Sequence, residues 1–501
     1  MQIGERDGRR QKLAGLLLTT ILMGAPLYGT DVGAQESPAS GTASAPPALA
    51  TPVGGPPPGG GKNRRGEKGL ETTSLEDLML EKGLITLDDW IRIKAEEEQK
   101  NAERSVVAEY TGSARWFDRI TQFGYGMLRY NNTSNGAFRS YQDASIGDKN
   151  SGAQPGFFFR RIRWVITGQV SDHVSFFIQP DLASNISGNT HVLSMRDAFG
   201  DWNFDKDKEY RLRLGLQRVP CSFDNWQASR VRMAIDRADA TNSCQNSERD
   251  LGVSFMWTPK VAQQRFKQML DYMYGPGDYG VFHIAVYNGQ GLNAQEANAD
   301  KHVGMRLAWP FELPGGRLLE VGANAMRGQF VVNHGTAAAG TTLFSFNQSG
   351  STSARSYRDE RLNFYMYYPP QPWGFIAEYT LGRTPERQAN GRVDNSALYG
   401  GYVQLHYQWK YSDIGLANFY SRYQEYRGGI KFQTGAPSGK MYEWENGVAW
   451  QPDPQWEFTV AYSMSQRMNL FTTDTGSATV PGIQKEQYAN LIRFQAIWFW
   501  N

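Results

Sequence analysis

From about residue 115 the chain alternates apolar and polar side chains with a period of two. The clearest stretch is YRLRLGLQRVP at residues 210–220, where Arg211 and Arg213 alternate with leucines. Successive side chains of a β-strand point to opposite faces, so this strand would have one apolar and one cationic face. An arginine that faces lipid near the bilayer midplane costs about 2–4 kcal/mol. The pattern therefore predicts that the leucines face a membrane and the arginines face a water-filled lumen.

The connections between the alternating runs are of two kinds. Short turns are predicted at Ser171–Asp172, Asp205–Lys208, Pro369–Pro372, Tyr411–Ser412 and Pro452–Gln455. Longer polar segments are predicted at Asn131–Gly156, Leu182–Leu193, Pro220–Arg249, Val331–Arg358, Glu425–Lys440 and Arg467–Lys485. One connection, Pro259–Gly277, is long where a short turn is due, and its KVAQQRFKQML favours a small periplasmic helix. About sixteen runs joined in this way predict an all-β fold, a sixteen-stranded antiparallel transmembrane β-barrel.

A second stretch rich in arginine, FFFRRIRWVITGQV at residues 157–170, follows the same parity and places Arg161 and Arg163 in the lumen. Arg160 and Arg218 fall on the outward parity, at outer strand ends where the cost of facing lipid fades. The inward parity also includes acidic residues, which are Asp197, Asp201, Glu378, Glu443, Glu445 and Glu457. Basic residues would thus lie mainly on early strands and acidic ones on later strands, an arrangement that could produce a transverse field across a pore.

The polar face of a soluble β-sandwich would alternate as well, but the aromatic faces of the later strands favour lipid. Trp444, Val448 and Trp450 share one such face. Aromatic residues make up 13% of the chain and its mean hydropathy is −0.54. Beyond the N-terminus no apolar run approaches the roughly eighteen residues that a membrane helix needs. The net charge of +2 is too small to suggest nucleic acid as a partner, although 36 of the 52 basic residues are arginine.

The N-terminal part of the chain has a different composition. Residues 1–34 combine a basic start, the apolar LAGLLLTTILMGAPL and a small-residue cleavage site, which predicts a signal peptide rather than a membrane anchor. Residues 35–69 are rich in Pro and Gly and predict a disordered linker. Residues 70–112 have helical spacing that is too short for a coiled coil and predict a short helical periplasmic segment. The barrel is predicted at residues 113–501.

The chain contains two cysteines, Cys221 and Cys244. In an oxidising compartment they can form a disulfide, and the sequence leaves this pairing and two free thiols both open. The six histidines show no ligand spacing, and the chain has neither a G-x-S-x-G elbow nor a P-loop. No catalytic residue, metal site or cofactor is therefore predicted. A barrel hydrolase with a scattered Ser and His is an alternative without a supporting motif.

The polar segment 220–249 follows the fifth predicted strand. In sixteen-stranded porins the loop at this place often folds into the barrel and forms the constriction, an analogy at the level of the fold. Here it carries four arginines, which are Arg230, Arg232, Arg237 and Arg249. Its acidic residues, with the one that follows it, are Asp224, Asp236, Asp239, Glu248 and Asp250. The arginines suit the recognition of oxyanions, whereas opposite charges that only hold the loop in place explain the same residues.

The chain resembles the phosphate-selective porin O and P family. The resemblance rests on FFFRRIRWVITGQVSDHVSFFIQPDLA, MRDAFGDWNF, LRLGLQRVPCSFDNWQAS and ERDLGVSF, and it extends from about residue 123 to the C-terminus. It implies an outer-membrane homotrimer of sixteen-stranded barrels that takes up phosphate or related anions. The arginine-rich strand segments of the family correspond to Arg161, Arg163, Arg211 and Arg213, and its loop arginines fall within Arg230–Arg249. Cys221 departs from the family, which usually has an aromatic residue there.

The residues and the resemblance together predict a porin in the bacterial outer membrane, surrounded by lipid. Small phosphate-like anions would diffuse passively through an arginine-lined constriction. Two alternatives remain at this point. One is a general diffusion porin with weak ion selectivity, and the other is a plugged barrel that acts as a binding protein.

Overall fold

The barrel is described by a computed structural model. It covers residues 79, 82, 119–134, 155–186, 189–270, 273–333, 356–388, 392–411, 414–433, 435–470 and 484–500. The chain divides into two units, residues 1–90 and 91–501, and the second contains the barrel. The predicted signal peptide, linker and helical segment lie outside the described residues, apart from residues 79 and 82.

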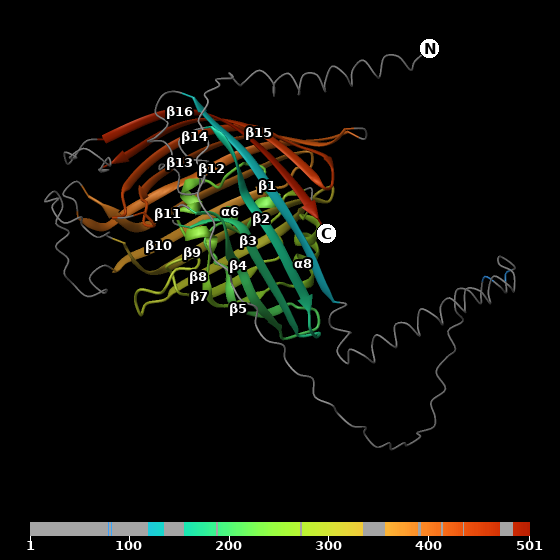
Figure 1. The fold of residues 1–501 in the computed structure, drawn as a ribbon. Helices are drawn as coiled ribbons and strands as arrows, with labels where there is room; N and C mark the ends of the chain where they lie inside the picture. Colours follow the sequence, from blue (N-terminus) through green and yellow to red (C-terminus); the bar gives the residue numbers. More distant parts are fainter. Residues whose placement is uncertain are drawn as a thin grey trace, which may run out of the picture. The chain divides into compact units, whose positions relative to one another are not determined.

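The described residues form sixteen antiparallel strands that close into one barrel, as predicted (Figure 1). Each strand pairs with its neighbours in sequence, and β1 pairs with β16 from Gly124 opposite Trp500 to Ser134 opposite Asn490. The strands are β1 (Ile120–Ser134), β2 (Gly156–Gln169), β3 (Val174–Ile186), β4 (Asn189–Asn203), β5 (Tyr210–Arg218), β6 (Arg249–Trp257), β7 (Phe282–Tyr287), β8 (His302–Leu313), β9 (Arg317–Val331), β10 (Ser356–Tyr368), β11 (Trp373–Arg387), β12 (Val393–Tyr411), β13 (Gly415–Gly429), β14 (Ser438–Asp453), β15 (Trp456–Leu470) and β16 (Gln484–Trp500).

The predicted connections hold at most places. The predicted short turns lie at the junctions of consecutive strands, although Tyr411 still belongs to β12 and Pro452–Asp453 to β14, and the helix α8 (Lys260–Gln268) lies in the long connection where a helix was expected. One expected long loop is wrong. Within Leu182–Leu193, β3 continues to Ile186 and β4 begins at Asn189. Polar residues occupy these strand ends because strands that extend beyond the lipid no longer need an apolar outer face.

The alternation of side chains separates lipid from lumen as predicted. On β5, Leu214 is 49% exposed and Arg213 beside it is 7% exposed. On β2, Trp164 is exposed, whereas Arg161 and Arg163 are buried. Most large exposed hydrophobic residues of the described chain lie on the outer face of the strands, so the polar core of this protein is the barrel interior.

Arg160 points to the other side of the wall from the predicted one. It is buried, and its Nη2 lies 3.4 Å from Oδ1 of Asp236, inside the barrel. The pairing of β1 with β2 shifts register between Met127 and Leu128, which leaves Arg160 as the extra residue of a β-bulge. A shift of one residue reverses the faces, so the bulge turns this arginine inward.

Arg218 was also assigned to the outward parity, and it too lies inside. It is the last residue of β5, is buried, and donates a hydrogen bond to the carbonyl oxygen of Trp226 in the following segment. At a strand end the side chain is no longer held by the strict alternation of the sheet. The Arg218 side chain therefore turns toward the Trp226 carbonyl oxygen, a buried acceptor that needs a donor.

The lipid-facing assignment of the leucines can be tested at the middle of β5. We expect Leu214→Arg to lower the free energy of unfolding by about 2–4 kcal/mol, because it places a charge near the bilayer midplane. Val174→Arg, at the first residue of β3 and also on the exposed face, should cost only about 0–1 kcal/mol. Reversible denaturant unfolding in lipid vesicles measures both values. Equal small losses at the two sites would contradict the assignment.

Candidate functional site

Residues 219–248, between β5 and β6, fold into the barrel and are called the inserted loop below (Figure 1). The loop contains four short helical turns, which are α6 (Phe223–Trp226), η1 (Ser229–Val231), α7 (Asp239–Asn242) and η2 (Asn246–Glu248). Nearly all of its described side chains are buried, and Phe223 and Trp226 are completely inaccessible. The fold-level analogy that placed this loop inside the barrel therefore holds.

The loop crosses the lumen and reaches the opposite wall. Its backbone N–H groups donate to lumenal side chains of distant strands: Phe223 to Glu378 on β11 at 2.7 Å, Asp239 to Gln424 on β13 at 3.0 Å and Ile235 to Glu445 on β14 at 3.2 Å. Buried backbone donors need partners, and the short turns and side chains of the loop itself satisfy only some of them. Inward acidic and amide side chains of the later strands thus hold the loop across the barrel.

Asp236 is the main charged anchor of the inserted loop. Its carboxylate lies 2.7 Å from Nη1 of Arg129, 3.1 Å from Nη1 of Arg493 and 3.4 Å from Nη2 of Arg160. Burial by itself would raise the pKa of Asp236, but these three guanidinium groups outweigh it and hold the pKa well below the ordinary carboxyl range. The anchor is therefore charged at neutral pH and joins the loop to β1, β2 and β16.

Cys221 and Cys244 form a disulfide, which settles the question that the sequence left open. Their Cα atoms are 6.5 Å apart, and both residues are buried against Tyr287 and Met326 on the barrel wall. The bridge lies near the two ends of the inserted loop and encloses the residues that cross the lumen. A covalent link here restricts how far the loop can leave the barrel.

A second charged cluster lies where the inserted loop returns to β6. Glu248 accepts from Nη1 of Arg237 at 2.7 Å and from Nη1 of Arg249 at 2.8 Å. Arg249 also binds Asp197 on β4, with 2.9 Å between Nε and Oδ1. Burial would raise the pKa of Glu248, but Arg237 and Arg249 hold it below its ordinary range. Both predicted arginines of this cluster are thus paired.

Arg161 and Arg232 differ from their neighbours, because neither forms an ion pair with a carboxylate in the described part of the chain. Arg161 is buried, its Nη1 lies 3.7 Å from the sulfur of Met127, and its Nε has no partner. Arg232 donates only to the carbonyl oxygens of Ala234 and Ile235, at 3.0 and 2.9 Å, and its Nη1 has no partner. Burial, and then the charge of a neighbouring arginine, lower the pKa of Arg232 to about 9, so it is protonated at neutral pH.

The unpaired arginines lie within one arginine-rich region between β2, β4 and the inserted loop. Arg161 is within electrostatic range of Arg160, Arg163 and Arg232. Arg163 binds Asp181 at 3.0 Å and donates to the hydroxyl groups of Tyr125 and Ser229. Seven arginines of the region outnumber the carboxylates near them. With Asp224, which also acts on Arg232, the carboxylates number five; these residues are Arg160, Arg161, Arg163, Arg196, Arg232, Arg237 and Arg249, with Asp181, Asp197, Asp224, Asp236 and Glu248.

The structure separates the other three predicted arginines from this region. Arg211 lies near the short-turn end of β5 and binds Asp278 at 2.8 Å. Arg213 binds Asp201 in a bidentate pair of 2.6 and 2.8 Å, and its guanidinium carbon is 3.7 Å from the centroid of the Phe199 ring. Arg230 is half-buried, with its guanidinium carbon 5.8 Å from the ring centroid of Phe123. Five of the eight predicted arginines are therefore brought together.

Several arginines of the lumen were not among the predicted site residues. The main ones are Arg129, Arg160, Arg196, Arg422, Arg467 and Arg493. The predicted acids of the later strands are inward as expected, but Glu443 and Glu445 on β14 are ion-paired with Arg422, Arg467 and Arg493 on β13, β15 and β16. The expected division into basic early and acidic late strands is therefore incomplete. Period-two parity alone would have found the strand arginines other than Arg160 and Arg196, because Arg196 is the extra residue of a second bulge, in the pairing of β3 with β4.

The described lumen offers charged side chains and no arrangement that suits a metal. No group of three or more His, Cys, Asp or Glu side chains in the described ranges is placed to hold a metal ion. Among the same residues, no helix is long and apolar enough to cross a membrane. The chemistry of this site is therefore that of arginine, carboxylate and backbone groups.

A closed sixteen-stranded barrel with an apolar outer face and a loop folded into a charged lumen defines a porin. The family model described as phosphate-selective porin O and P matches residues 134–484. This chain belongs to that family, which places it in the bacterial outer membrane as a channel. No curated protein is detectably similar in sequence.

Solved outer-membrane proteins are similar in fold at low identity. The channel DcaP of Acinetobacter baumannii has a TM-score of 0.47 at 12% identity, over 76% of this chain and 97% of that chain. Pseudomonas putida OprB has a TM-score of 0.45 at 8% identity, over 78% and 97% of the two chains. An anion-selective porin from Comamonas acidovorans has a TM-score of 0.41 at 11% identity, over 76% and 99%. The family assignment rests on the sequence match and not on these structures.

The role of Asp236 as an anchor can be tested by Asp236→Asn. Removing the charge takes away a counter-ion that three buried guanidinium groups share, and breaking a buried ion pair typically costs about 3–5 kcal/mol. We expect the inserted loop to loosen, so that single-channel conductance increases and becomes noisier. Asp207→Asn is the matched control, because Asp207 pairs with Lys260 in an exposed turn. Planar-bilayer recordings compare the two variants, and an unchanged conductance for Asp236→Asn would contradict the anchoring role.

Proposed function

We propose that this porin is a passive channel for small anions, with phosphate or a related oxyanion as its main solute. The anions pass the arginine-rich region where the inserted loop faces β2. The observation that carries this proposal is the pair of buried guanidinium groups, Arg161 and Arg232, that have no carboxylate partner in the described residues. No covalent chemistry is involved.

The physical argument concerns uncompensated charge. Burying an ion without a partner costs several kcal/mol, and a mobile anion that arrives beside it removes part of that cost. The planar guanidinium fork fits two oxygens of a phosphate better than it fits a single chloride ion. Arg161 and Arg232 also have other arginines around them, and the seven arginines of the region face only five carboxylates. Anions therefore enter this region more readily than cations.

The remaining predicted arginines are proposed to contribute less. Arg211 and Arg213 are each paired with a carboxylate, so their net charge as seen by a passing ion is small. Arg237 and Arg249 share Glu248 and hold the loop in position. We assign them a positioning role beside the two unpaired groups, and Arg163 the same role through Asp181.

The alternative of a general diffusion porin has one supporting observation. Glu378 and Glu457 are inward and buried, and neither forms an ion pair among the described residues. Glu378 lies on β11, across the barrel from β2, and would contribute to a transverse field if it were charged, whereas Glu457 lies on β15, only three strands from β2 around the ring. Glu443 and Glu445 do not add to such a field, because arginines of β13, β15 and β16 neutralise them. We therefore favour anion selectivity.

Trimeric assembly is a further part of this proposal. It follows from the resemblance of the chain to a family expected to form homotrimers. The barrel gives a simple means of testing it, because native mass spectrometry of the purified porin distinguishes one chain from three. A plugged binding barrel remains the other candidate, and a complete absence of conductance would favour it.

The selectivity is tested by the reversal potential of the purified porin in a planar bilayer under a salt gradient, with and without phosphate. We expect anion selectivity, and a chloride current that falls as phosphate competes for the site. The double variant Arg161→Gln and Arg232→Gln should weaken the phosphate competition about tenfold or more, since each tenfold change corresponds to about 1.4 kcal/mol.

Arg327→Gln is the matched control, because Arg327 is on the outer face and 73% exposed. It should leave both the reversal potential and the phosphate effect unchanged. Weak selectivity in the wild-type porin, or phosphate competition that survives the double substitution, would reject the proposal in favour of the general diffusion porin.

A further inference from the structure

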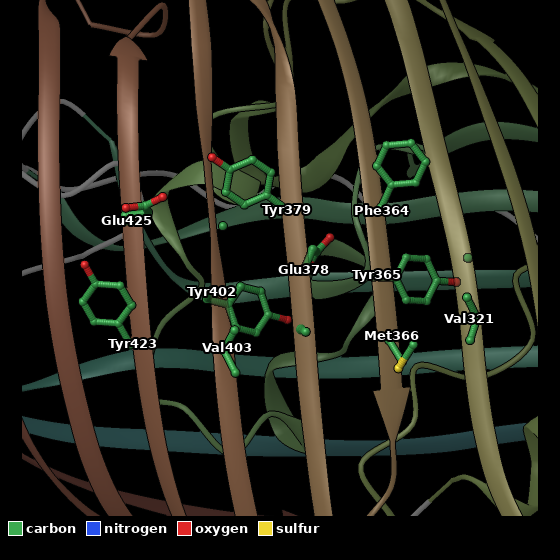
Figure 2. A pocket seen from close by; sticks show the side chains of 13 residues that line it. Val321, Phe364, Tyr365, Met366, Glu378, Tyr379, Tyr402, Val403, Tyr423 and Glu425 are labelled. Atoms are coloured by element: carbon green, nitrogen blue, oxygen red, sulfur yellow. The ribbon is translucent and has the colours of Figure 1, made fainter.

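The outer face of β9 to β13 has a groove of about 540 Å³ (Figure 2). Its walls are large side chains that alternate with lumenal ones along each strand. Phe364 and Val403 are 50% and 52% exposed, and Met366, Tyr379 and Tyr423 are exposed beside them. These residues belong to β10, β11, β12 and β13, so the groove runs across four strands on the lipid side of the wall.

The groove exists because two small residues lie between large ones in the same cross-strand rows. Ala377 is opposite Met366 on one side and Val403 on the other. In the next row toward the loop end, Gly401 lies between Tyr379 and Glu425. A Cβ added at Gly401 would come within 2.0 Å of the Glu378 carbonyl oxygen, so this floor cannot be filled without moving the backbone.

The groove has a charged end. Glu425 lines it on β13, and Figure 2 shows the Tyr379 hydroxyl directed toward the strand that carries Glu425. Two residues further along β13 on the same face is Arg427, which is exposed and directly opposite Lys440 on β14. The Lys440 ammonium lies 5.1 Å from the ring centroid of Tyr442. Neither cation forms an ion pair among the described residues.

The position of these cations relative to the membrane follows from the strand. β13 begins at Gly415, after a short turn, and ends at Gly429, beside the connection 430–437. Short turns lie at the periplasmic end of such barrels and longer connections at the outside. Arg427 and Lys440 are therefore at the outer rim, and the groove lies beneath them at the depth of the outer leaflet.

We propose that this groove binds a phosphorylated glycolipid of the outer leaflet. One acyl chain lies in the groove and packs against Phe364, Met366 and Val403, because close packing is what favours apolar contacts within lipid. Arg427 and Lys440 bind a head-group phosphate, as paired cations do at other phosphate sites. Glu425 accepts a hydrogen bond from a head-group hydroxyl or amide. The apolar groove thus accommodates the acyl chain, the two cations bind the phosphate, and the Glu425 carboxylate binds the polar head-group donor of the same lipid.

The inference is independent of the pore, because every residue in it is on the outer face of the barrel. The probe is lipid A with two phosphates, added to the purified porin in detergent, and native mass spectrometry counts bound lipid per chain. We expect one lipid A per chain to be retained preferentially, with at least tenfold weaker retention of a dephosphorylated lipid A of the same acyl composition. Arg427→Gln with Lys440→Gln should reduce the retention of lipid A by at least tenfold.

Ala377→Leu fills the groove and should reduce retention of both lipids. Its matched control is Ala325→Leu, since Ala325 faces outward on β9 between Met305 and Leu362, outside the groove. Arg358→Gln is the control for the charged pair, because Arg358 is exposed on the same face and bound to Glu360 at 2.7 Å. Both controls should retain lipid A as the wild type does. Conductance should be unchanged in all these variants, which confirms that each barrel is folded.

Two results would overturn the proposal. Equal retention of phosphorylated and dephosphorylated lipid, or equal retention by the wild type and the double variant, would show that the cationic rim recognises no phosphate. If Ala377→Leu instead changed the number of chains in the assembly and left lipid retention intact, the groove would be a contact between copies of this chain. Neither result depends on the ion selectivity of the pore, so the two proposals fail separately.

Discussion

Pairing of the first strand with the last is the constraint on which the rest of this structure depends. The hydrocarbon of a membrane supplies no hydrogen-bond partners, so a sheet can cross it only when no edge is left open. Here β1 and β16 close the ring along eleven paired positions. Closure gives every strand one face toward lipid and one toward the lumen. The apolar exterior, the charged interior and the space for the inserted loop all follow from it.

Inside the closed wall, charge is the main source of order. The inserted loop forms many hydrogen bonds within itself, and wall side chains add ion pairs to Asp236 and Glu248 and accept from further backbone donors. Most of the buried lumenal arginines form ion pairs with carboxylates of the loop or the wall. Arg161 and Arg232, which like Arg218 form no ion pair among the described residues, lie where the loop meets β2, and this local imbalance is the physical basis of the proposed anion path. The number of arginines in the lumen matters less than which of them lack a counter-ion.

The two faces of the same strands serve different chemistry. On β11, Glu378 points inward and holds the inserted loop, while Ala377 and Tyr379 on either side point outward and form part of the lipid-facing groove. The period of two lets neighbouring residues face water and lipid without interfering. A substitution on one face can therefore test one proposal without disturbing the other.

Much of the architecture was determined by the sequence alone. The alternation of Arg211 and Arg213 with leucines, repeated along the chain, predicts the strand faces. The residues of the turns predict the number of strands, and the length and composition of one connection predict the helix α8. These signals are local, because each depends on residues within a few positions of one another. The candidate arginines Arg161 and Arg163 were placed in the lumen by the same parity.

Tertiary structure decided what depends on residues distant in the chain. A bulge opposite β1 turns Arg160 inward, and the sequence of β2 contains no sign of it. The meeting of Cys221 with Cys244, and the anchoring of Asp236 by Arg129 and Arg493, require the loop to be folded into the closed barrel. Whether a guanidinium is paired or free is likewise a property of three-dimensional neighbours, which a period of two cannot encode.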